Sequence, residues 1–220
     1  MIQISRWSIR IATLIYCIYM LFFSEMYPFM ALNVLLGYIP LEISFHFKKL
    51  RNQLFLIVGF FWLLFYPNAP YLFTDFFHLE NLPINQGMDQ IFSQSLSAWF
   101  SFSLLTVGIC VYGFLGMATV FTVLNESFSR NILQKKWQGA IFVLGVNILS
   151  SLAIFVGRFD RLHSVYLFTK PIETLQIIFL TWSIEKALFI LLFTVMQLIL
   201  LAAIVMAKGL ELVDRNEKLH

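Results

Sequence analysis

The chain has 220 residues, of which 60% are hydrophobic and 12% are charged, and its formal net charge is +3. Soluble domains carry about twice this fraction of charged residues, so the composition excludes an ordinary soluble domain and predicts an integral membrane protein. Membrane topology explains the excess of basic residues better than nucleic-acid binding does. Cys17 and Cys110 both lie within apolar runs, so we expect buried thiols and no disulfide framework.

Apolar stretches predict an all-α, polytopic membrane bundle forming a single domain. Arg6 and Arg10 precede the first stretch, as in a signal peptide, but no small-residue cleavage pattern follows it, so we interpret it as an uncleaved span. The apolar segment 172–182 is too short to span and is expected to lie in the interface or to re-enter the membrane. We predict about six transmembrane helices, with approximate bounds 7–23, 27–45, 53–77, 96–124, 137–156 and 186–207, followed by a short cytoplasmic tail at 208–220.

The third predicted span is broken by Pro67-Asn68-Ala69-Pro70. Its first part, residues 54–66, is about 20 Å of helix at ~1.5 Å per residue, which falls short of the ~30 Å hydrocarbon core. We predict that Asn68 caps a second helix with Pro70 in its first turn. Because irregular backbone at this depth needs cover from protein or a water-filled cavity, the polar face of this second helix is expected to point into the bundle. At helical spacing that face contains Tyr71, Thr74, Asp75 and His78.

The distribution of basic residues predicts the orientation. With both termini inside, the inner segments carry 11 of the 15 Lys and Arg residues, which favours an N-in, C-in topology. The face containing Asp75 and the segment 157–163 then converge at the outer surface. Four tryptophans lie near predicted span ends, as an aromatic belt requires: Trp7, Trp99, Trp137 and Trp182.

Arg158 and Arg161, one turn apart at the outer end of the fifth span, are a candidate clamp for a phosphate or carboxylate. The broken third helix would add free N–H groups near Asn68 and Tyr71. The plainer interpretation is that arginines at a helix C-terminus offset the helix dipole and extend to water. The sequence leaves both interpretations open.

Asp75 and His78 are weak candidates for an acid/base pair, or for two metal ligands with His163 as a third. The alternative is a salt bridge from Asp75 to Arg158 or Arg161 at a helix end. Loosely spaced ligands are a weak metal pattern, so we predict no metal and no other cofactor.

Other polar residues within the spans are expected to hold helices together. We expect Glu42 to pair with Lys48 or Lys49, one to two turns further along the chain. Three asparagines are interpreted as interhelical hydrogen-bonding residues rather than site residues: Asn33, Asn125 and Asn147.

The stretch Pro67-Asn68-Ala69-Pro70-Tyr71, with Thr74-Asp75 and His78-Leu79, resembles the signature of a bacterial membrane family known as domain of unknown function 1361. Gly157-Arg158-Phe159, with Arg161, Ser164 and Pro171, resembles its second signature, although Leu162-His163 stands where the family usually has Trp-Asn. The resemblance covers roughly spans two to six. It implies a multi-pass protein of a bacterial plasma membrane and supplies no activity, substrate or catalytic residue.

Three functions remain open. The first is a non-enzymatic membrane protein whose outer face binds an anionic lipid headgroup or a partner membrane subunit. The second is an outer-face enzyme acting on a lipid-linked or phosphorylated substrate, with His78 or Asp75 as base. The third is a small transporter, which the broken helix favours, whereas the scarcity of intramembrane carboxylates and the lack of a repeat disfavour it. The candidate ligand-binding residues are Asn68, Tyr71, Thr74, Asp75, His78, Arg158 and Arg161.

Overall fold

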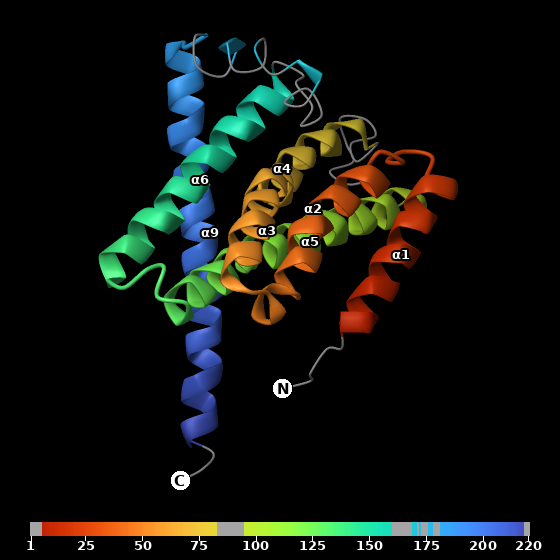
Figure 1. Ribbon diagram of the computed structural model, residues 1–220. Coiled ribbons are helices and arrows are strands. Elements are labelled where there is room, and N and C mark those ends of the chain that lie inside the picture. The colour runs from red at the N-terminus through yellow and green to blue at the C-terminus, as the bar shows by residue number, and fades with distance from the viewer. Residues whose placement is uncertain are drawn as a thin grey trace.

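The computed structural model describes residues 6–82, 95–159, 169–170, 172, 176–177 and 181–217, without the side chains of 81 and 210–217. Every regular element in this part of the chain is a helix, so the predicted all-α fold is confirmed there (Figure 1). The long helices are α1 (Arg6–Phe22), α2 (Met30–Ser44), α3 (Asn52–Phe65), α5 (Leu96–Ser129), α6 (Lys136–Arg158) and α9 (Ile184–Glu217). Three short helices join them: η1 (Phe47–Lys49), α4 (Asn68–Tyr71) and η2 (Leu72–Asn81).

Five segments of the described chain are long and apolar enough to cross a membrane, and they correspond to the second to sixth predicted spans. Helix α1 has 17 residues and is not among them, so a sixth span is not confirmed. The segment 172–182 lies largely outside the described residues, and its predicted re-entry stays a prediction. The five segments are Met30–Lys49, Asn52–Glu80, Leu96–Ser129, Lys136–Arg158 and Ile184–Gly209.

Helix α2 lies at the centre of one group of helices, where it contacts α1, α3, α4 and α5. Helix α6 packs along α9, and the long helix α5 contacts both of them as well as the first group. In Figure 1, η2, the end of α6 and the start of α9 lie toward the top, which we call the upper end. The end of α2, η1 and the starts of α3 and α6 lie at the opposite, lower end.

The break in the third span lies where it was predicted, but its local geometry differs. Helix α3 ends at Phe65, and the predicted role of Asn68 as the cap of the following helix is wrong. Its side-chain Nδ2 instead donates to the carbonyl of Phe65 at 2.9 Å, which satisfies a carbonyl at the end of α3. Tyr66 keeps helical dihedrals despite the proline that follows it, and beyond Tyr71 the chain continues as the 3₁₀-helix η2.

Small residues allow the break to pack closely against its neighbours. A Cβ atom added at Gly116 of α5 would lie 2.4 Å from the Cβ atom of Ala69 and 3.0 Å from the carbonyl oxygen of Gly37. One added at Gly113 would lie 2.9 Å from the ring of Phe73. Glycines at helix contacts let backbones approach in membranes, where packing is the main source of association. Three elements therefore meet with almost no side chain between them: α2, α4 and α5.

Buried polar side chains connect the helices at mid-length. Asn147 of α6 accepts a hydrogen bond from the hydroxyl of Tyr66 at 3.4 Å, which confirms its interpretation as an interhelical residue. On α9, Gln197 donates to the hydroxyl of Ser151 at 2.8 Å, and Thr194 lies 3.0 Å from the same hydroxyl. Asn125, by contrast, is an exposed residue.

Glu42 does not pair with either predicted lysine. Its carboxylate accepts hydrogen bonds from Arg10 of α1, at 3.0 Å from Nε, and from the hydroxyl of Tyr38. The imidazole of His46 lies 3.1 Å from the same carboxylate. The lysine prediction is wrong because α2 ends at Ser44, so Lys48 and Lys49 lie on η1 and not on the continuation of the same helix.

Arg130 joins the end of α5 to the turn between α2 and α3. Its guanidinium donates to the carbonyls of Phe47 at 2.9 Å and Leu50 at 2.8 Å, and to the side chain of Asn52 at 2.9 Å. It also lies 3.4 Å from Glu126, and only 11% of the side chain is exposed. This one cation therefore ties the end of α5 to the turn after α2, in addition to the bond that the carbonyl of Phe47 accepts from the N–H of Leu50 at 3.1 Å.

Replacing Arg130 with alanine is expected to lower the free energy of unfolding by about 2 kcal/mol, because the hydrogen bonds that this charged donor makes to two carbonyls and to Asn52 are lost. Reversible unfolding by dodecyl sulfate in mixed micelles measures this difference. Lys136→Ala, which removes an exposed cation at the same lower end, is the matched control and is expected to change stability by less than about 0.5 kcal/mol. Equal losses in the two variants would contradict the assigned role of Arg130.

Candidate functional site

Three elements bring polar groups together at the upper end: α2, η2 and the end of α6. The centre is Asp75, whose side chain is 0% exposed. Its Oδ2 accepts a hydrogen bond from Nδ2 of Asn33 at 2.7 Å. Its Oδ1 lies 3.7 Å from Nη1 of Arg158 and 3.9 Å from Nε2 of His78. The ion pair between Asp75 and Arg158 that the sequence left open is therefore present.

The Oδ1 atom of Asp75 is buried and accepts no hydrogen bond within the described part of the chain. Buried polar atoms in proteins are nearly always hydrogen-bonded, and 3.7 and 3.9 Å are too long for such bonds. Asp75 is thus held by one amide and by the charge of Arg158. Its Oδ1 atom can therefore still accept hydrogen bonds.

Arg158 is the last residue of α6, and it is anchored on one side only. Its Nη1 donates to the hydroxyl of Tyr71 at 3.2 Å, and the guanidinium lies 5.8 Å from the centre of the same ring. The side chain is 28% exposed. Within the described residues, Nη2 and Nε make no hydrogen bond, so Arg158 keeps free donors beside a buried carboxylate.

His78 completes the cluster from the far end of η2. Its ring lies 4.5 Å from the ring of Phe29 between centroids, and its side chain is 32% exposed. The hydroxyl of Tyr27 donates to the backbone carbonyl of His78 at 3.1 Å. These two aromatic contacts hold the segment before α2 against η2 and fix the position of the imidazole.

The remaining predicted site residues do not join the cluster. The hydroxyl of Thr74 donates to the carbonyl of Tyr71 at 2.7 Å, three residues earlier, and the amide of Asn68 is taken up by the carbonyl of Phe65. The predicted shared face is divided because side chains three apart align in a 3₁₀-helix, which brings Asp75 and His78 into one row. Arg161 and His163 lie outside the described residues, and their roles stay predictions.

Sequence reasoning assigned none of Tyr27, Phe29 and Asn33 to the site. The predicted interhelical hydrogen bond of Asn33 is confirmed by its contact with Asp75, but its membership of the cluster was missed. For Asn33 there was a signal, because a polar amide at the same end of a neighbouring span is a natural partner for a carboxylate within the membrane. Tyr27 and Phe29 gave none, since the chain contains 25 phenylalanines and 8 tyrosines. Among the described residues, no group of three or more His, Cys, Asp and Glu side chains comes together as a metal site would require.

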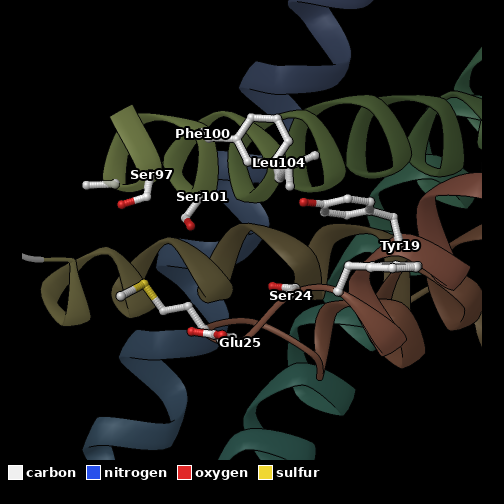
Figure 2. Close-up of a pocket in the computed structure, with 10 residues that line it drawn as sticks. Tyr19, Ser24, Glu25, Ser97, Phe100, Ser101 and Leu104 are labelled. Atoms are coloured by element: carbon white, nitrogen blue, oxygen red, sulfur yellow. The ribbon is translucent and has the colours of Figure 1, made fainter. Parts of the chain in front are cut away.

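A separate cavity of about 410 Å³ lies between the end of α1 and the start of α5 (Figure 2). It is bounded by the end of α1, the segment that follows it and the first turns of α5. The cluster around Asp75 does not line this cavity. Its lining residues are Tyr19, Phe23, Ser24, Glu25, Met26, Ser97, Ala98, Phe100, Ser101 and Leu104.

One family model matches the chain over residues 32–200, and its description reads "Protein of unknown function (DUF1361)". The matched range includes Asn33, the break at 67–70, Asp75, His78 and Arg158. No curated protein matches the chain, and no solved structure matches it. The match therefore covers the polar members of the cluster on α2, η2 and α6 and assigns no chemistry to them.

Proposed function

We propose a function from the geometry of the upper end, on the premise that the chain belongs to the DUF1361 family, as its two signatures predicted. The chain is a non-enzymatic integral membrane protein that binds an anionic headgroup, a phosphate or a carboxylate, at the outer face of a bacterial plasma membrane. Arg158 is the main contact, and His78 and the hydroxyl of Tyr71 lie beside it. Asp75 and Asn33 hold the arginine in place.

This proposal rests on one observation: the described polar contacts of the Arg158 guanidinium with Tyr71 and Asp75 are made through Nη1 alone. The buried carboxylate of Asp75 and the hydroxyl of Tyr71 both approach Nη1, at 3.7 and 3.2 Å. A guanidinium fixed at one nitrogen presents its other donors in the planar arrangement that matches two oxygens of a phosphate or carboxylate. Asp75 supplies one negative charge to one positive charge, so the proposed anion binding rests on the unused donors of Arg158 and not on a net positive charge.

Burial of Asp75 supports a binding role over a catalytic one. A general base must reach the proton that it removes, within hydrogen-bond distance or through one water. Asp75 is 0% exposed, and the cavity between α1 and α5 is lined by other residues. The polar groups farther down α6, at Asn147 and Ser151, are bonded to neighbouring helices, which supports a packing role for them over a transport path.

The test compares anion binding by two variants with that of the unchanged protein. Asp75→Asn leaves the hydroxyl of Tyr71 as an anchor for Arg158 and removes the charge that competes for its donors. We expect it to strengthen binding about fivefold, since two unit charges about 4 Å apart interact by about 1 kcal/mol in water. Asp75→Asn with Arg158→Gln removes both charges and is expected to abolish binding. The probes are inorganic phosphate, followed by ³¹P line broadening, and phosphatidylglycerol in nanodiscs, followed by native mass spectrometry.

Glu185→Gln, which removes an exposed carboxylate at the start of α9, is the control and is expected to leave the affinity unchanged. Binding of inorganic phosphate alone would identify a free anion as the ligand, and retention of phosphatidylglycerol alone would identify a lipid headgroup. Equal binding by the unchanged protein and both Asp75 variants would refute the proposal. If the pair of Asp75 and Arg158 only held helices together and contacted no ligand, the unchanged protein and both variants would show the same anion binding.

A further inference from the structure

The cavity between α1 and α5 points to a second ligand of opposite charge. We propose that it binds an ammonium group, either from a lipid headgroup of the ethanolamine or choline type or from a free amine. The site is separate from the cluster around Asp75 and shares no residue with it. Its ligand is therefore independent of the function proposed above.

The walls of the cavity combine aromatic rings with a carboxylate. The rings of Tyr19 and Phe23 stack at 5.7 Å between centroids, and Phe100 from α5 meets Tyr19 edge-on at 5.8 Å. Figure 2 shows Ser24 and Glu25 on the segment after α1, across the cavity from the serines of α5. Aromatic faces and a nearby carboxylate are the groups that proteins use to bind quaternary and primary ammonium ions.

Serine hydroxyls complete the polar part of the cavity, and all of them can accept hydrogen bonds. Ser24 already accepts from the backbone N–H of Tyr27 at 3.2 Å, and Ser97 lies 2.9 Å from the hydroxyl of Ser95. Each hydroxyl oxygen has two acceptor sites, so acceptors remain for the N–H groups of a primary amine. Ser101 adds a third hydroxyl on the same wall.

The charge balance favours a cation over an anion. Among the described residues, Glu25 is the only charged one that lines the cavity, and it is exposed. The start of α5 lies nearby, but a helix N-terminus carries only about +0.5 of an elementary charge, and the hydroxyl of Ser95 already accepts from Ala98 there at 3.4 Å. The negative charge of Glu25 therefore exceeds the positive end of the dipole.

The volume fits a headgroup rather than a single ion. A cavity of about 410 Å³ falls within the range of roughly 300–1,000 Å³ that is typical of small-molecule sites. An ammonium against the rings of Tyr19 and Phe100 would leave room toward the serines for a second polar group of the same headgroup.

The experiment uses the full chain in phosphatidylglycerol nanodiscs and titrates tetramethylammonium and ethylammonium chlorides by calorimetry, with sodium chloride as the blank. Glu25→Gln is expected to weaken ammonium binding about fivefold through the lost charge, and Tyr19→Leu about threefold through the lost ring face. Glu185→Gln, which removes an exposed carboxylate at the start of α9, is the matched control. A second arm uses nanodiscs of mixed phosphatidylethanolamine and phosphatidylglycerol and identifies the retained lipids by native mass spectrometry.

Binding of the free amines with this pattern of variants supports the proposal and identifies a soluble amine as the ligand. Retention of phosphatidylethanolamine with the same pattern supports it and identifies a lipid headgroup. Absence of binding in both arms, or binding that Glu25→Gln and Tyr19→Leu leave unchanged, overturns it. Neither result depends on Arg158, so this proposal and the anion site can fail separately.

Discussion

Replacing Arg158 with leucine is expected to lower the free energy of unfolding by about 3 kcal/mol, because breaking a buried ion pair leaves an uncompensated charge. The charge left behind is that of Asp75, which is 0% exposed and, within the described part of the chain, keeps only the hydrogen bond from Asn33. Breaking a buried ion pair costs roughly 3–5 kcal/mol. We expect a value at the low end because 28% of the Arg158 side chain is exposed. Dodecyl sulfate titration in mixed micelles measures the change.

A second substitution separates the pair from its individual residues. Adding Asp75→Asn to Arg158→Leu is expected to recover at least about 1 kcal/mol, because residues in contact show coupling energies of roughly 0.5–3 kcal/mol. Arg51→Leu, which removes an exposed arginine before α3, serves as the control and is expected to have little effect. If the losses of unfolding free energy in the two single variants simply add in the double variant, Asp75 and Arg158 do not interact. The interpretation that Asp75 anchors the arginine would then be wrong.

The helices and the position of the break follow from local properties of the chain. Apolar runs predicted the five segments long enough to span, because hydropathy depends only on the residues themselves. Two prolines within four residues predicted the interruption after Phe65, since proline removes backbone donors and restricts the residue before it. Helix α1 is the marginal element, as its 17 residues do not reach the length of the other spans.

The contacts within the cluster depend on packing between distant segments, and they were harder to predict. Placing Thr74 on one face with Asp75 and His78 assumed 3.6 residues per turn, whereas η2 has the tighter 3₁₀ winding. Asn33 and Asp75 are 42 residues apart in the chain, and their hydrogen bond exists because α2 packs on η2. The same reason explains Glu42, whose partner Arg10 comes from α1 rather than from the lysines close by in sequence.

The Asp75–Arg158 pair and the glycine contacts explain why the break and the second signature belong to one structural unit. Arg158 contacts η2 from α6, and Asn33 contacts it from α2. Below them, Gly116 allows α5 to approach Ala69 within the break itself. The polar contacts can form at these distances only if the break lies close to α2 and α5. The cluster around Asp75 therefore depends on the close approach that Gly116 allows.

Replacing Gly116 with alanine is therefore expected to lower the free energy of unfolding by about 3 kcal/mol, at the upper end of the cost of overpacking a core. The new Cβ atom would lie 2.4 Å from the Cβ atom of Ala69 and 3.0 Å from the carbonyl oxygen of Gly37, and neither can move without its backbone. Because α4 must shift away, the same variant is expected to weaken binding of phosphatidylglycerol at Arg158. Gly145→Ala is the matched control, since nothing lies within 4 Å of its added Cβ atom, and alanine in an open helical position is expected to stabilise by about 0.4–1 kcal/mol. Equal stability of the two variants would mean that the backbones of α4 and α5 do not meet at Gly116, and the break would then lack the support on which the cluster around Asp75 depends.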